Sequence, residues 1–553
     1  MADSIKNYRH CDDEPSKSFF LIKNLTQLTL TTVMVGAVTG ANAFEISTGN
    51  PDLNVNLDTT ARYTLGVRAE SQDKKILNNP VYGADSDALF KRGDLVANRL
   101  DLLTEFVVTY KREMGARVSA AGWVDEAYSR GPQNALGNDT PYFGNNWSPT
   151  ADRYYKGPSG EILDAFVFGK IDVGPVPVNV KAGRHTNYWG ESLFAAHTGV
   201  NYGQAPVDIR KALANPGSEA KELFFPMNQV SAQAQLTDTV SLSSYYGLEW
   251  RADRIPDGGT YLGDVAFLFQ GPDKFPLIGA TRLDPLKGRN SGDFGISFKW
   301  RPENLDGVLG FYYRKFDEKL PWVQFGVNGQ NAYREVFARG TELYGVSLNK
   351  VFGGVSVGTE LAYRKDTALL STGVSGEDNQ GARGNTLHGL VNAIALLNKS
   401  PMWDSAVLLG ELTWTHRLSV SKHAELAQID GNIGCAGKDK WDGCTTKDAF
   451  AVNLAFTPTW TQVFPSIDLS LPITYGIGLK GNGATPGSSN QGAGSYSIGL
   501  SAAYQGNTTV TLKYNDYLVK YRDDGNVVTS FNGQSPALLS DRGWVSLTLK
   551  TSF

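Results

Sequence analysis

Two cysteines in the C-terminal part of the chain have the spacing of a disulfide. Cys435 and Cys444 enclose a polar stretch rich in glycine and lysine, CAGKDKWDGC. No histidine or second cysteine pair completes a zinc set, and the chain carries the export signal described below, so a disulfide is favoured over a metal site. In the chain-entropy model, a bridge across so short a loop stabilises the fold by about 2 to 3 kcal/mol.

Residue patterns of known enzymes do not appear in this sequence. The segment GESL at 190–193 lacks the Gly-x-Ser-x-Gly elbow of serine hydrolases, and no His-x-x-x-His or Glu-x-x-His ligand spacing occurs. His388 and His416 fall near the external ends of neighbouring predicted strands, but two such histidines are far more often surface residues than a catalytic pair. The glycine-rich run 481–494 lacks the lysine of a phosphate loop. We therefore predict no catalytic residue, no metal and no cofactor.

Composition excludes two broad classes of protein. The 553 residues are 41% apolar, include 24 Tyr, 26 Phe and 11 Trp, and carry a net charge of -4. No apolar run approaches the roughly 18 residues that a membrane-spanning helix needs. The absence of a basic bias argues against nucleic acid as the main partner. Abundant aromatic residues are instead typical of the interface girdles of membrane β-barrels.

Residues 1–43 have the features of a signal peptide. Lys17 and Lys23 precede a mostly apolar stretch at 25–38, and the residues Ala-Asn-Ala at 41–43 fit the small-residue cleavage pattern. We therefore expect the mature chain to begin at Phe44. Residues 1–16 are longer and more acidic than such a signal requires, which indicates a misassigned start. The alternative, a cytoplasmic helix, is weakened by threonines that interrupt its amphipathic face.

The mature chain, 44–553, alternates apolar and polar residues along successive segments. Between residues 55 and 70 the odd positions are mainly apolar and the even positions mainly polar, as in a strand between lipid and a wet lumen. Similar segments predict an all-β, transmembrane, up-and-down antiparallel barrel of about eighteen strands, with sixteen as the alternative. The predicted strands are 54–69, 97–112, 115–127, 162–171, 176–184, 228–236, 240–251, 291–301, 308–317, 341–350, 354–364, 386–398, 405–416, 448–461, 467–478, 494–504, 508–521 and 542–553.

Connections between these strands alternate in length. Long ones such as 70–96 and 185–227 are separated by short ones such as 237–239 and 505–508. This alternation predicts short periplasmic turns and long external loops, and it places the disulfide outside. A soluble sandwich or propeller offers no reason for it.

The last ten residues are expected to close the barrel. Val545, Leu547, Leu549 and Phe553 share one face. In water this edge would be an aggregation hazard, but in a barrel it faces lipid and pairs with the first strand. A terminal Phe also looks like the signal by which the barrel assembly machinery recognises its substrates. The alternative is an ordinary last strand of a soluble sheet.

One long connection carries a distinctive motif. The stretches GRHTNYWGES at 183–192, PMNQV at 226–230 and YGLEWR at 246–251, together with the alternating strands, resemble the outer-membrane family called DUF1302. The resemblance covers nearly the whole mature chain. It implies an exported barrel that takes up hydrophobic compounds alongside an inner-membrane transporter. Many relatives have Gln where this chain has His185, so the resemblance assigns no fixed role to that side chain.

We expect the connection at 185–227 to fold into the lumen and constrict it. It is too long for a bare loop, has helical composition, and contains Leu213, Leu223, Phe224 and Phe225, which would be unfavourable in water. Its root would be formed by Arg184, His185, Tyr188, Trp189 and Glu191. Arg184 could pair with Glu191 or a lumen carboxylate, while Tyr188 and Trp189 could pack the following helix against the wall. The alternative is that these residues only anchor an external loop.

These features predict a channel or uptake protein of a Gram-negative outer membrane rather than an enzyme. Eighteen strands enclose more space than side chains can fill, so the lumen must be open or plugged. A structural or assembly scaffold is the alternative. Expected partners are outer-membrane lipid, the barrel assembly machinery, a hydrophobic small molecule and an inner-membrane transporter.

Overall fold

A computed structural model describes residues 44–79, 84–133, 146–215, 220–263, 273–275, 279–532 and 539–553. The predicted signal peptide, residues 1–43, lies outside these ranges and stays a prediction. Among the described residues, no helix has both the length and the apolar character to cross a membrane, a finding that does not bear on strands.

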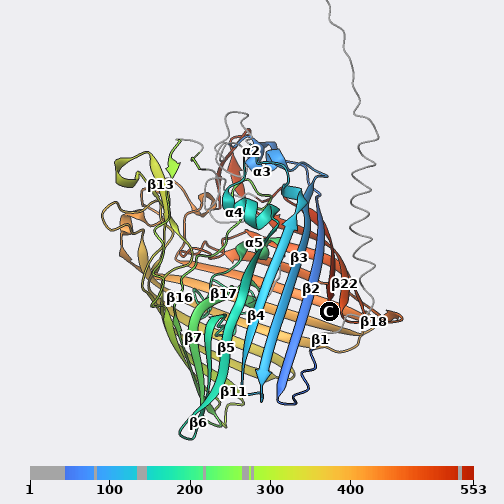
Figure 1. The fold of residues 1–553 in the computed structure, drawn as a ribbon. Coiled ribbons are helices and arrows are strands. Elements are labelled where there is room, and N and C mark those ends of the chain that lie inside the picture. Colours follow the sequence, from blue (N-terminus) through green and yellow to red (C-terminus); the bar gives the residue numbers. More distant parts are fainter. Residues whose placement is uncertain are drawn as a thin grey trace, which may run out of the picture.

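The described chain forms a closed β-barrel (Figure 1). The order of strand pairing gives its wall eighteen antiparallel positions. The sheet contains 20 strands, of which β1 (Phe44–Glu45) is a short addition to β2, and β19 and β20 together occupy one wall position. The wall strands are β2 (Leu53–Arg68), β3 (Leu95–Tyr110), β4 (Met114–Asp125), β5 (Ser159–Val173), β6 (Val176–His185), β7 (Met227–Thr237), β8 (Val240–Gly247), β10 (Phe294–Trp300), β11 (Gly307–Phe316), β14 (Thr341–Phe352), β15 (Val355–Ala368), β16 (Arg383–Leu397), β17 (Ser405–Lys422), β18 (Asp448–Phe464), β19 (Ile467–Ser470) with β20 (Ile473–Lys480), β21 (Gly494–Tyr504), β22 (Thr508–Leu518) and β25 (Trp544–Ser552).

All eighteen predicted strands are confirmed, with shifted ends. The predicted strand 467–478 is interrupted between β19 and β20, where Pro472 has no N–H to donate to a neighbour. The predicted strand 240–251 ends at Gly247, and β17 continues past residue 416 to Lys422. The count of eighteen, rather than sixteen, is therefore correct.

The first and last wall strands close the barrel. β2 pairs with β25 from Thr60 opposite Ser552 to Arg68 opposite Trp544. Phe553 continues this seam, because its N–H donates to the Thr59 carbonyl at 2.8 Å and its carbonyl accepts from the Thr59 N–H at 2.7 Å. Closure leaves the last strand paired on both sides, as the sequence predicts.

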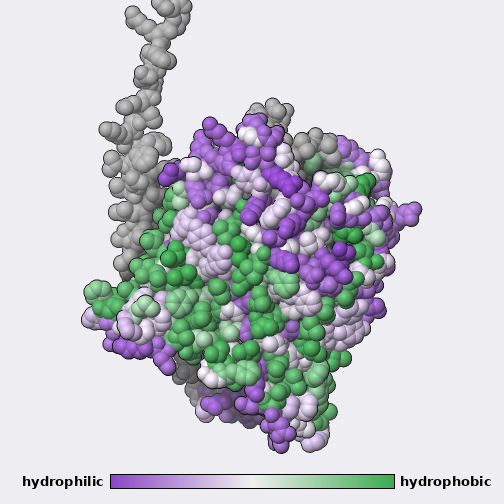
Figure 2. All heavy atoms as spheres, turned by 180° about the vertical axis from the view of Figure 1, so that it is seen from behind, coloured by the Kyte–Doolittle hydropathy of each residue, from purple (hydrophilic) through white to green (hydrophobic). Residues whose placement is uncertain are grey.

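Residues of each wall strand alternate between the two faces. On β15, Leu361 is 42% exposed on the outside, whereas its neighbour Glu360 is 6% exposed and points inward. A band of hydrophobic residues covers the outer wall, while hydrophilic residues gather at the end that carries the long connections (Figure 2). A closed barrel with an apolar outer wall is the form in which strands cross a membrane. The chain is an outer-membrane protein of the Gram-negative type, with lipid around its wall.

Long connections gather at one end of the barrel and contain short helices and small sheets (Figure 1). The helical segments are α2 (Lys74–Leu77), α3 (Ala84–Leu89), η1 (Glu126–Tyr128), α4 (Pro149–Ala151), η2 (Asp152–Lys156), α5 (Ile209–Ala214), α6 (Ala220–Leu223), η3 (Val327–Gly329), η4 (Ala424–Leu426) and η5 (Lys440–Asp442). The additional strands are β9 (Thr281–Arg282), β12 (Trp322–Phe325), β13 (Ala332–Val336), β23 (Tyr521–Asp523) and β24 (Val528–Phe531). Cys435 and Cys444, in the β17–β18 connection, form the predicted disulfide.

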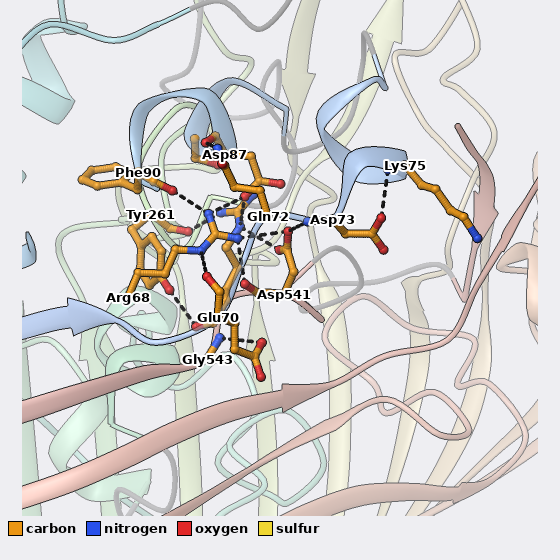
Figure 3. Close-up of polar contacts among 12 residues, drawn as sticks. Arg68, Glu70, Gln72, Asp73, Lys75, Asp87, Phe90, Tyr261, Asp541 and Gly543 are labelled. Atoms are coloured by element: carbon orange, nitrogen blue, oxygen red, sulfur yellow. Dashed lines mark hydrogen bonds and ion pairs between the residues drawn. The ribbon is translucent and has the colours of Figure 1, made fainter. Parts of the chain in front are cut away.

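A buried cluster of charged side chains lies at the external end of the β2–β25 seam (Figure 3). The Arg68 guanidinium contacts the Asp87 carboxylate at 2.8 Å and the Asp541 carboxylate at 3.0 Å. Arg542 contacts the same Asp87 oxygen at 2.8 Å. Since Asp87 belongs to α3, the cluster fastens the β2–β3 connection to the seam.

Candidate functional site

The connection from Thr186 to Pro226, here called the inner loop, is the candidate site. It leaves the wall at the end of β6 and its described residues reach β17. Following the pairings from β6 through β7, β8, β10, β11, β14, β15 and β16, β17 is the eighth wall strand along, nearly half of the way around an eighteen-strand barrel. The inner loop therefore contacts the wall far from the strand that it leaves.

Two inward carboxylates bind the backbone of the inner loop. Glu360 on β15 accepts hydrogen bonds from the N–H groups of Glu191, Ser192 and Val200, the last two at 3.2 and 2.7 Å. Glu411 on β17 accepts from the N–H groups of three consecutive residues, 193–195, at 2.6, 3.1 and 2.7 Å. Buried backbone amides need such partners, because an unpaired buried N–H is unfavourable.

Two buried arginines bind the carbonyl groups of the same segment. Arg314 on β11 donates to the carbonyls of Val200 and Tyr202, both at 2.7 Å. Arg364 on β15 donates to the carbonyls of residues 197 and 198 at 2.9 and 2.7 Å, and its guanidinium lies 3.7 Å from the centroid of the Tyr202 ring. Wall side chains thus satisfy both the donors and the acceptors of an irregular backbone.

Glycines in the wall make room for side chains of the inner loop. A Cβ atom at Gly345 on β14 would lie 2.4 Å from Val200, and one at Gly295 on β10 would lie 2.9 Å from the Trp189 ring. Both distances are shorter than van der Waals contact. The wall is therefore complementary in shape to the inner loop as well as in hydrogen bonding.

Trp189 and Glu191 lie among residues of the wall. The Trp189 ring is 9% exposed, and its centroid lies 5.2 Å from the Tyr245 ring on β8 and 6.2 Å from the Tyr312 ring on β11. The Glu191 carboxylate accepts a hydrogen bond from Asn349 on β14 at 2.9 Å. It does not pair with Arg184, contrary to one of the partners that the sequence suggests.

Tyr188 packs on the later part of the inner loop, and His185 lies inside the wall. The Tyr188 ring is 5.4 Å from the Phe224 ring, in a cluster that includes Val207 and Leu223. The imidazole of His185 hydrogen-bonds the Ser231 hydroxyl at 2.7 Å and the carbonyl of residue 183 at 3.0 Å.

The predicted burial of apolar residues in the inner loop is confirmed. Leu223, Phe224 and Phe225 are buried, and Leu213 packs against a second cluster around Phe90. Leu213 belongs to α5 and Leu223 to α6, and Phe224 and Phe225 follow α6 directly.

Hydrogen bonds from outside the inner loop hold its later part in place. The Asp253 carboxylate accepts a hydrogen bond from the Val207 N–H at 2.8 Å, and burial raises the pKa of Asp253 to about 7.

His197, in the earlier part of the inner loop, is neutral near pH 7. Desolvation, and secondly the nearby Arg364, lower its pKa to about 4.

Arg184 lies apart from these contacts, at the external end of β6. Its guanidinium is 3.6 Å from the Glu249 carboxylate and donates to the Ile162 carbonyl at 3.2 Å. The predicted root residues therefore divide into a group inside the barrel and Arg184 at its rim.

Histidines 388 and 416 do not form a pair. In the β16–β17 register His416 stands opposite Leu387, and His388 stands opposite Thr415, so the two imidazoles belong to opposite faces of the wall. His388 is buried beside the Thr386 hydroxyl, whereas His416 contacts Asp448 at 2.7 Å. Within the ranges that the structure describes, no group of three or more His, Cys, Asp or Glu side chains could hold a metal ion.

The sequence alone did not link Glu360 or Arg364 to the inner loop. It missed Glu411 and Arg314 altogether. The available signal was the presence of ionisable residues at inward positions of strands, where burial requires a partner.

Solved structures of three outer-membrane proteins are similar to this one. For OccK1 (OpdK) of Pseudomonas aeruginosa the identity is 8% and the TM-score 0.39, with 90% of this chain and 98% of that chain covered. For OccAB1 of Acinetobacter baumannii the identity is 8% and the TM-score 0.42, with 93% of this chain and 99% of that chain covered. For OmpF of Salmonella typhi, solved in complex with daunomycin, the identity is 9% and the TM-score 0.37, with 92% of this chain and 100% of that chain covered. None of the curated proteins matches this chain at a significant level.

A family model described as "Protein of unknown function (DUF1302)" matches residues 24–553. The match covers nearly the whole chain and confirms the resemblance that the motifs at 183–192, 226–230 and 246–251 indicate. The chain belongs to the DUF1302 family.

Proposed function

We propose that this protein is a non-enzymatic outer-membrane channel for the uptake of small hydrophobic molecules, with a lumen narrowed by the inner loop. The main support is the attachment of this loop to Glu411, eight strand positions from its origin on β6. A segment held on both sides of a barrel leaves less open cross-section than the wall alone. Hydrophobic substrates and delivery to an inner-membrane transporter are implied by the family resemblance.

In this proposal the residues of the predicted root have separate tasks. Trp189 and Glu191 hold the inner loop on β8, β11 and β14, while His185 and Tyr188 hold its two ends. Because Glu360 and Glu411 use their oxygens for backbone amides, they serve to position the loop and are not free to act as acids or bases.

Replacement of residues 205–222 by a short Gly/Ser linker tests the proposal. The linker variant should admit larger neutral sugars than the wild type in liposome swelling, because the part of the inner loop that contains α5 is gone. Heat-modifiable migration on gels serves as the control for barrel assembly. An assembled variant with unchanged permeability would show that this segment does not limit passage.

A further inference from the structure

The wall has a notch at the external end of β5. β5 pairs with β4 from Ser159 to Gly169, but with β6 only from Ala165 onward. In the described part of the chain, no strand pairs with residues 159–164 on the side of β6. Two guanidinium groups bind carbonyls there instead: Arg153 donates to Gly160 and Arg184 to Ile162, both at 3.2 Å.

A cavity of about 640 Å³ opens at this notch. Its lining includes Ile162, which is 53% exposed on the outer, lipid-facing side of the wall. Glu161, the preceding residue, also lines the cavity and belongs to the opposite face of β5. The cavity therefore lies where the outer surface meets the interior.

Arg254 connects the cavity to the inner loop. Its guanidinium binds the Glu161 carboxylate through two hydrogen bonds, at 2.8 and 2.5 Å. Its backbone N–H donates to the Val207 carbonyl at 2.9 Å, and its carbonyl accepts from the Ile209 N–H at 2.8 Å. Arg254 alone would thus separate an occupant of the cavity from the inner loop, the segment that we propose narrows the lumen.

The cavity lining has an excess of positive charge. Arg153, Arg184 and Arg251 line it together with Glu161 and Glu249, and Arg254 already neutralises Glu161. Three arginines then face a single remaining carboxylate. Arginine side chains bind carboxylates and phosphates in a fork geometry, so the lining is suited to an anion.

Arg251 differs from Arg153 and Arg184 in that its guanidinium, which lies 5.8 Å from the centroid of the Phe225 ring, donates no hydrogen bond to a carbonyl within the described ranges. Its distances to Glu249 and Glu161 are 3.9 and 4.0 Å, longer than hydrogen bonds, and it makes no hydrogen bond to another described residue. Desolvation, and secondly the neighbouring Arg254, lower the pKa of the Arg251 guanidinium below its ordinary value. A bound anion would compensate this charge.

We propose that the notch binds the anionic head of an amphiphile whose apolar tail lies in the outer leaflet beside Ile162. The head is a carboxylate or phosphate, carried either by a free amphiphile or by a membrane lipid. The combination of a cationic lining with a lipid-exposed mouth favours an amphiphile over a fully water-soluble anion. The meaning of this site for transport rests on the proposed uptake function, since the site would present the amphiphile to the inner loop.

The test uses the full mature chain in nanodiscs of phosphatidylcholine and the fluorescent carboxylate dansylundecanoate. We expect saturable binding that laurate and dodecyl phosphate displace and dodecanol does not. Arg251→Gln should weaken binding by about tenfold, the effect of losing one charge-assisted contact. Arg251→Lys should retain most of the affinity, and Arg301→Gln, in the exposed turn after β10, is the matched control and should bind like the wild type.

Two outcomes would overturn the proposed anion site. One is displacement of the probe by dodecanol as effectively as by laurate, and the other is wild-type affinity for the probe in an assembled Arg251→Gln variant. Nanodiscs that also contain lipopolysaccharide distinguish the two sources. Loss of probe binding in these discs assigns the head to a lipid, and retained binding assigns it to a free amphiphile. The assay does not depend on permeability, so its outcome is separate from that of the linker variant.

Discussion

At the scale of single residues, charges in this barrel are buried where they join segments distant in sequence. Asp87 contacts Arg68 and Arg542, and the side chains of all three residues are fully buried. Without Asp87, the two buried arginines would share a single carboxylate, that of Asp541, which contacts Arg68 at 3.0 Å and Arg542 at 3.2 Å. A buried excess of positive charge is far more destabilising than the loss of an exposed ion pair.

Asp87→Asn should therefore destabilise the external end of the seam. Removal of one partner from an isolated buried pair lowers the free energy of unfolding by roughly 3 to 5 kcal/mol, and because Asp541 remains beside both arginines the loss should not exceed this range. The measurement is the temperature at which the folded, fast-migrating form is lost on gels, together with protease cleavage in the β2–β3 connection.

Lys399→Gln is the control for this variant, because Lys399 is 79% exposed and pairs with Asp404 at the surface. If Asp87→Asn and Lys399→Gln lose the folded form at the same temperature, the buried cluster does not stabilise the seam.

At the scale of elements, the inner loop is held through its backbone rather than through its own side chains alone. Glu411→Ala removes the acceptor of three consecutive amides, at residues 193–195. Each unsatisfied buried donor is unfavourable by about 1 to 3 kcal/mol, so this segment should detach from β17. Single-channel recordings should show larger current fluctuations than the wild type.

Glu425→Ala, at an external carboxylate that is 69% exposed, is the matched control. If current fluctuations of Glu411→Ala are no larger than those of Glu425→Ala, Glu411 does not anchor the inner loop.

At the scale of the whole molecule, the seam between β2 and β25 converts a sheet with two edges into a closed wall. Phe553 extends that seam by two backbone hydrogen bonds to Thr59 and has an exposed, outward side chain. Deletion of Phe553 should sharply lower the amount of assembled barrel in outer-membrane fractions while export continues, because both the seam and the proposed assembly signal are shortened. Quantitative blots of the heat-modifiable form provide the measurement.

Phe464→Ala is a suitable comparison, since Phe464 is also exposed but lies at the end of β18, away from the seam. If both variants assemble at the wild-type level, Phe553 is not required for assembly.

The wall could be derived from the sequence because its signal is local. Alternation along β2 or β25 requires knowledge only of neighbouring residues, and a one-residue shift would exchange every apolar side chain between lipid and lumen. Closure followed from the same pattern, since an apolar last strand needs a partner on each side. The break between β19 and β20 also has a local cause, because Pro472 has no N–H to donate to a neighbouring strand.

The contacts of the inner loop depend on tertiary structure. Trp189 and Glu191 were identified from the motif, but Glu360 and Glu411 lie more than 150 residues away along the chain, and no spacing connects them. Arg184 shows the same limit: the sequence placed it correctly at a strand end, whereas its partner Glu249 depends on where β8 ends. Alternation is decided between adjacent residues, but partners inside a lumen are decided by closure of the wall, which brings distant strands to opposite sides of one space.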